Sequence, residues 1–173
     1  SKAGKEALDS EATMPHEHER LLNIYLPLLA LPNAVRWVAL AAALAAIVVA
    51  FSGWSGAKPA GPNLRRFSIL FVIVMDIEFL IGLVRYFGVS PITRAALTNF
   101  GEEMKQHEPR FFAIEHSMLM LLAVICAHLG AALARKGRTD LMKYRGPAIA
   151  YSISLLLMLA GIPWWRPLLR LGF

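Results

Sequence analysis

Several ionisable residues lie within or at the edges of long apolar runs of this sequence, where such side chains are costly unless they are paired or used. Six of them are Arg36, Asp76, Glu78, Arg85, Glu115 and His116. An imidazole beside carboxylates can ligate a tetrapyrrole, contact a quinone head group or carry protons. These residues are therefore the first candidates for a functional site.

The spacing of four of them predicts a shared location. Glu78 and Arg85 fall on one helical face, because an offset of seven residues returns to nearly the same direction. Glu115 and His116 stand within about 8 Å of the start of their apolar run, and Arg36 stands at a similar depth in its own. We expect Arg36, Arg85, Glu115 and His116 to share one layer.

Two interpretations of this layer remain open. In the first, Arg36 and Arg85 neutralise Glu115 and Glu78 and fix the register of the helices. In the second, the layer binds haem b, a quinone or a chlorophyll-type pigment through His116, with Glu115 or Glu78 as the acidic partner. Both interpretations can hold together.

Asp76 and His128 stand apart from the layer. Asp76 points about 200° away from Glu78 and has no evident local partner, so it is a proton-relay candidate, either protonated or paired with a neighbouring subunit. His128 follows His116 by twelve residues, which leaves the two rings about 120° apart. No other apolar run contains a histidine, so we expect no bis-histidine haem within the chain and a hydrogen-bonded structural role for His128. Methionines available as axial ligands are Met75, Met118, Met120 and Met158.

The composition is that of a membrane protein. Of 173 residues, 57% are apolar and only 17% are charged, with a mean hydropathy of +0.51. The single Cys126 cannot form a disulfide within the chain, and we expect no metal site. The net charge of +6 indicates basic loops that face anionic lipid rather than nucleic acid. The expected partner is therefore the lipid bilayer.

Four apolar runs are each about long enough for a helix to cross roughly 30 Å of hydrocarbon. They are residues 33–53, 67–87, 111–134 and 147–163. Since they show no alternation of period two, the sequence predicts an all-α fold, an integral membrane four-helix bundle over residues 33–163. The flanking regions are predicted to be a polar N-terminal tail (1–20), an interfacial segment (21–32) broken by prolines, and an interfacial C-terminal tail (164–173).

Basic residues gather in the two loops that join consecutive spans. The first loop contains Lys58, Arg65 and Arg66, and the second contains Arg135, Lys136, Arg138, Lys143 and Arg145. The positive-inside rule then places both loops in the cytoplasm and both termini outside. Stripes of small residues predict the packing seams of the first and third spans. The stripes are Ala39, Ala42, Ala43, Ala46 and Ala50, and Ala123, Ala127, Ala131 and Ala134.

Short motifs at the span ends carry a family resemblance. They are LPNAVRW (31–37), FSGW (51–54), GLVRYF (82–87), RFFAIEH (110–116) and IPW (162–164). Together they resemble a family of small bacterial four-helix membrane proteins commonly labelled cytochrome b-like. The resemblance covers residues 26–165 and implies a multi-pass protein of the bacterial cytoplasmic (inner) membrane.

The resemblance also implies haem binding or electron transfer through histidines in spans one, two and three. This chain keeps Glu115 and His116. At the matching ligand positions it has Pro32 in span one, and Asp76 and Glu78 in span two. Two of the three ligand positions therefore lack histidine. A scaffold of this kind suits a role beside a larger redox or photosynthetic complex.

Three classes of function remain. The first is an accessory integral membrane subunit of a respiratory or photosynthetic electron-transfer complex, which stabilises or seals quinone, haem or pigment sites of other membrane subunits. The alternative is a cytochrome b-like haem- or quinone-binding protein that uses His116 and Glu115. A channel or transporter is least favoured, because the sequence has no inverted repeat. No catalytic constellation is readable from the spacing, so we expect no enzyme acting alone, at most a non-catalytic subunit of an oxidoreductase complex.

Overall fold

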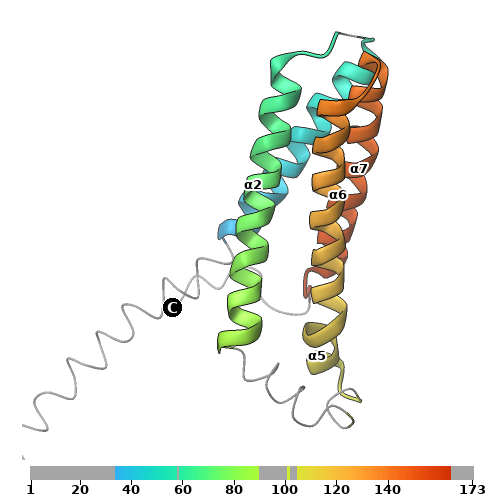
Figure 1. Ribbon diagram of the computed structural model, residues 1–173. Coiled ribbons are helices and arrows are strands. Elements are labelled where there is room, and N and C mark those ends of the chain that lie inside the picture. Colours follow the sequence, from blue (N-terminus) through green and yellow to red (C-terminus); the bar gives the residue numbers. More distant parts are fainter. Residues whose placement is uncertain (1–33, 58, 90–100, 102–104, 165–173) are drawn as a thin grey trace, which may run out of the picture. The chain divides into compact units, whose positions relative to one another are not determined.

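The computed structural model describes residues 34–57, 59–89, 101 and 105–164. The long helices are Ala34–Ser55, α2 (Pro62–Val84), α6 (His116–Lys136) and α7 (Asp140–Gly161). Three short elements adjoin them, the π-helical turns η1 (Arg85–Val89) and η2 (Phe111–Glu115) and the helix α5 (His107–Arg110). The four long helices run up and down in chain order (Figure 1). The predicted all-α four-helix bundle is confirmed.

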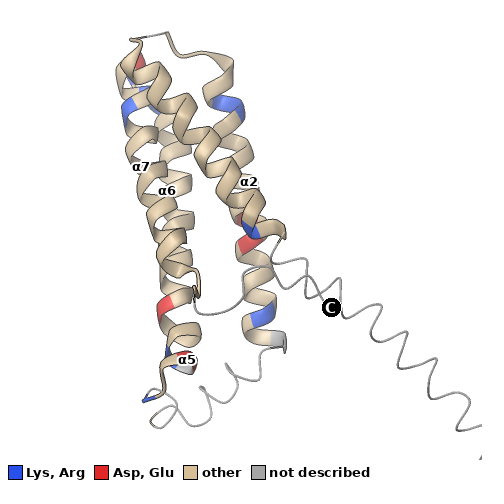
Figure 2. Cartoon of the chain, turned by 180° about the vertical axis from the view of Figure 1, so that it is seen from behind, with Lys and Arg blue, Asp and Glu red and all other residues tan. Residues whose placement is uncertain are grey.

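Within the described residues, three helices are long and apolar enough to cross a membrane, and the chain is a membrane-embedded protein. They cover Ala34–Ser55, Pro62–Phe87 and Phe111–Lys136. Each of the helices α6 and α7 has a long central stretch without charged side chains (Figure 2). These three helices overlap the first three predicted spans, with different bounds at some of their ends.

The fourth predicted span behaves differently. α7 begins at Asp140 rather than at Pro147, because the Thr139 side chain caps it by accepting a hydrogen bond from the Met142 amide at 3.2 Å. Its first turns are charged, and the apolar part from Pro147 to Gly161 is only about 22 Å long. α7 is therefore not among the helices apolar enough to span, and a fourth crossing remains a prediction.

α2 also begins earlier than its apolar run. Pro62 occupies the first helical turn after the extended Gly61, and this position suits proline because an amide there has no partner within the helix. The Tyr144 hydroxyl of α7 fixes this start, since it accepts from the Gly61 amide at 3.2 Å and donates to the Pro59 carbonyl at 3.1 Å. The turn before α2 is thereby tied to the start of α7.

Many of the predicted small residues are buried in the bundle, although Ala131 and Ala134 are only half-buried. The buried small residues are Ala39, Ala42, Ala43, Ala46 and Ala50 in the first helix and Ala123, Ala127 and Gly130 in α6. Gly130 lies against the fully buried Tyr151 of α7, whose ring meets Phe71 of α2 edge to face at 5.4 Å. Three helices therefore meet around one tyrosine ring.

Other predictions concern residues outside the described ranges. These are the N-terminal tail (1–20), the interfacial segment (21–32) and all of the C-terminal tail (164–173) beyond Trp164. The expected orientation of the termini also remains a prediction.

Candidate functional site

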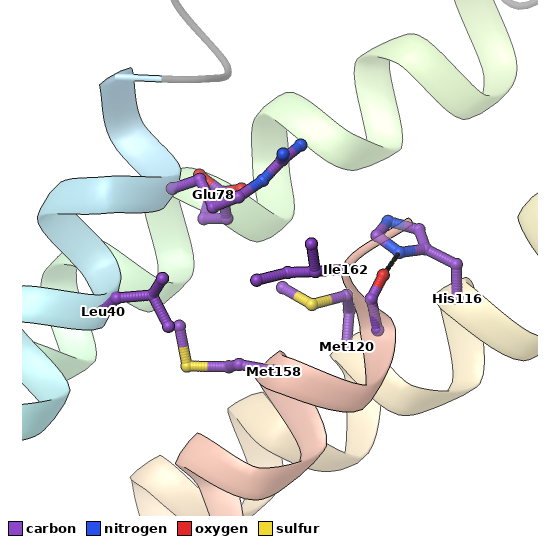
Figure 3. Close-up of a pocket in the computed structure, with 8 residues that line it drawn as sticks. Leu40, Glu78, His116, Met120, Met158 and Ile162 are labelled. Carbon is purple, nitrogen blue, oxygen red and sulfur yellow. Dashed lines mark hydrogen bonds between the residues drawn. The ribbon is translucent and has the colours of Figure 1, made fainter. Parts of the chain in front are cut away.

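A small cavity lies where all four long helices approach one another (Figure 3). Its volume is about 20 Å³, and it is lined by Arg36, Leu40, Glu78, His116, Met120, Met158, Gly161 and Ile162. A space of this size holds about one water molecule. Three of the predicted site residues, Arg36, Glu78 and His116, are therefore brought together.

His116 joins the start of α6 to the end of α7. Its Nδ1 lies 2.7 Å from the carbonyl oxygen of Gly161, and Figure 3 shows this bond at the edge of the cavity. A carbonyl oxygen only accepts hydrogen bonds, so Nδ1 carries the proton and Nε2 keeps its lone pair when the ring is neutral. The rings of Phe111 and Phe112, from the π-helical turn η2, each have centroids 6.0 Å from the imidazole.

Glu78 supplies the acidic group of the cavity. Its Oε2 is buried and has no hydrogen-bond partner among the described residues. The cations whose charges act on this carboxylate are Arg36 and Arg85. Arg85 itself is exposed and does not line the cavity. The neutralisation of Glu78 by the two arginines remains a prediction, since the ion pairs found among the described residues do not include Glu78.

Glu115 does not join this group. Its Oε1 accepts a hydrogen bond from Arg110 Nε at 2.9 Å, and it contributes nothing to the cavity lining. The sequence predicted pairing with Arg36 or Arg85, whereas the helix actually starts at His107 and brings Arg110 within reach of Glu115. The predicted layer is therefore divided between a cavity and a pair at the helix entrance.

Asp76 and His128 form a pair that the sequence analysis missed. His128 Nε2 lies 2.9 Å from Asp76 Oδ1, and this contact joins α6 to α2. The His128 side chain is 51% exposed and the Asp76 side chain is 43% exposed. A signal was present, since the two residues lie about 9 Å and about 14 Å from the same end of their predicted spans. An acid and an imidazole at similar depths on antiparallel helices meet when the faces that carry them are turned toward each other.

The described residues do not fit a haem or a quinone inside the bundle. The cavity holds about one water, and its single histidine already uses Nδ1 for the Gly161 carbonyl. Met120 and Met158 line the cavity, whereas Met75 is buried elsewhere and Met118 is exposed. Among all the residues that the structure describes, no group of three or more His, Cys, Asp or Glu side chains is placed to hold a metal ion.

Comparison of the chain with protein-family models, with curated proteins and with solved structures found no match. The described residues thus form a membrane-embedded bundle with a small cavity that contains Arg36, Glu78 and His116, and with an exposed Asp76–His128 pair between two of its spanning helices.

Proposed function

We propose that this protein is an accessory integral membrane subunit of a larger electron-transfer complex, in which it supports quinone, haem or pigment sites built by other subunits. The observation that carries the proposal is the half-exposed Asp76–His128 pair on α2 and α6. Both helices are long and apolar enough to cross a membrane, and the pair lies well inside them.

Polar groups that face hydrocarbon raise the free energy of a membrane protein. An ionisable side chain that faces lipid near the middle of a span costs several kcal/mol. One hydrogen bond between helices returns only about 0.6 kcal/mol on average. The second carboxylate oxygen of Asp76 and the Nδ1 of His128 have no bond among the described residues. A helix of another subunit with a polar side chain at this depth would remove the remaining cost.

The electron-transfer setting rests on the cytochrome b-like resemblance. The tight packing of alanine and glycine against large rings supports a structural rather than a cofactor-carrying role, because the interior is filled by protein. The partner would then contribute the cofactor sites, and this chain would contribute a rigid lateral surface.

A second candidate is a cytochrome b-like protein that binds haem or quinone through His116 with Glu115. One observation favours it: the Nδ1 proton is fixed by Gly161, which leaves the Nε2 lone pair available, as in metal-ligating histidines. Two observations disfavour it. The cavity is too small for a haem or a quinone, and Glu115 is hydrogen-bonded to Arg110.

One preparation separates the two candidates. The tagged chain is extracted gently from its native membranes, its co-purifying subunits are identified, and absorption spectra are recorded oxidised and then dithionite-reduced. We expect colour that belongs to larger subunits and persists in a His116→Ala variant, while the isolated chain is colourless. A Soret band on the isolated chain that disappears in His116→Ala would overturn the proposal in favour of the second candidate.

A further inference from the structure

A groove between the end of α6 and the start of α7 combines cations with aliphatic side chains. Its volume is about 490 Å³. The cations are Lys136, Arg138 and Arg145, and the aliphatic residues include Leu133 and Ile149. We call it the α6–α7 groove.

The groove lies at the end of a membrane-spanning helix. The span Phe111–Lys136 ends at Lys136, and Arg138 follows in the short connection to α7. Leu133 lies about 4 Å before this end, and Ile149 lies about 14 Å along α7. Both aliphatic side chains are exposed. The groove therefore runs from the level of lipid head groups toward the acyl chains.

The three cations have no carboxylate partner among the described residues. The nearby Asp140 is 3.8 Å from Lys143 Nζ, and Lys143 does not line the groove. The Arg145 guanidinium lies 5.9 Å from the centre of the Trp54 ring, which restrains it without cancelling its charge. The mouth of the groove thus holds uncompensated positive charge above an apolar wall.

We propose that the α6–α7 groove binds one anionic phospholipid, with its phosphate between Lys136, Arg138 and Arg145 and an acyl chain against Leu133 and Ile149. Basic pockets at helix ends on one side of a membrane bind such head groups. A zwitterionic lipid fits less well, because its own cation faces the same three charges. The apolar wall distinguishes a lipid from free phosphate. The site is independent of the proposed electron-transfer partner.

The test is a titration of the purified full-length chain in neutral detergent with dioleoyl phosphatidylglycerol, followed by native mass spectrometry. The groove variant is Lys136→Gln/Arg138→Gln/Arg145→Gln. A control of equal charge, Arg65→Gln/Arg66→Gln/Arg135→Gln, removes three exposed cations that do not line the groove. Circular dichroism checks that both variants stay helical.

We expect the groove variant to bind phosphatidylglycerol about 100-fold more weakly than the wild type, since each Lys or Arg near an anionic head group contributes about a factor of five. The control should bind within a few-fold of the wild type, and phosphatidylcholine should bind weakly to all three proteins. Equal losses in both variants would overturn the proposal, because they indicate diffuse surface charge. Displacement of the lipid by millimolar inorganic phosphate would also overturn it, because the apolar wall would then contribute nothing.

Discussion

The imidazole Nδ1 of His116 lies 2.7 Å from the carbonyl oxygen of Gly161, 45 residues further along the chain. This bond ties the first residue of α6 to the last residue of α7, at the end of the bundle opposite to their short connection. The two helices are thus joined at both ends. His116 therefore has a structural role whether or not its Nε2 binds anything.

This role predicts the behaviour of two variants. His116→Ala removes the donor and should lower the free energy of unfolding by about 1 kcal/mol. His116→Asn keeps an N–H group near the Nδ1 position and should recover part of that loss. Unfolding in mixed detergent and SDS measures both. Equal stability of the wild type and His116→Ala would show that the bond contributes nothing.

Gly130 should not tolerate a methyl group. A Cβ at this position would overlap the ring of the fully buried Tyr151, which also meets the ring of Phe71 edge to face. Overpacking of this kind costs about 1–3 kcal/mol, more than the helix propensity that alanine gains. We therefore expect Gly130→Ala to lower the melting temperature in detergent.

Gly82 provides the matched control for that substitution. It is also helical, but a Cβ there would meet nothing within 4 Å. Gly82→Ala should be neutral or more stable by up to about 1 kcal/mol. Equal melting temperatures of the two alanine variants would contradict the close contact between Gly130 and Tyr151.

Two serines of α7 allow a similar comparison. Ser154 Oγ donates to the Ala123 carbonyl of α6 at 2.7 Å, whereas Ser152 Oγ donates to Ala148 within its own helix at 2.8 Å. Ser154→Ala should cost about 0.6 kcal/mol and at most about 1.7 kcal/mol, and Ser152→Ala should cost less. SDS unfolding curves of the two variants test this order, and a larger loss in Ser152→Ala would reverse the interpretation.

Much of the fold follows from local sequence. Runs of apolar residues predict the first three spans, because hydrocarbon thickness sets helix length. Spacing of small residues predicts which faces pack, and the burial of Ala39, Ala43 and Ala127 agrees. The helices α2 and α7 begin earlier than their apolar runs, because the start of a helix depends on single residues outside those runs. These residues are Gly61 with Pro62 for α2, and Thr139 for α7.

The site was harder to predict because it depends on contacts between helices. The depth of each residue placed Arg36 and His116 together, and this grouping holds in the cavity. The partner of Glu115 depended on where the helix starts, and the sequence analysis placed that start after Arg110. The Asp76–His128 pair required the rotation of α2 against α6, which the sequence of one helix does not determine.

The proposed contact of the Asp76–His128 pair with another subunit can be tested directly in native membranes. Asp76→Leu and His128→Leu remove the exposed polar pair, while Arg110→Gln removes the similarly exposed Arg110–Glu115 pair at the start of the span Phe111–Lys136. Native gel electrophoresis of gently solubilised membranes then reports the size of the complex that contains the chain. We expect a large complex in the wild type and Arg110→Gln, and a free chain in Asp76→Leu and His128→Leu. A complex of unchanged size in both leucine variants would contradict the proposed role of the Asp76–His128 pair.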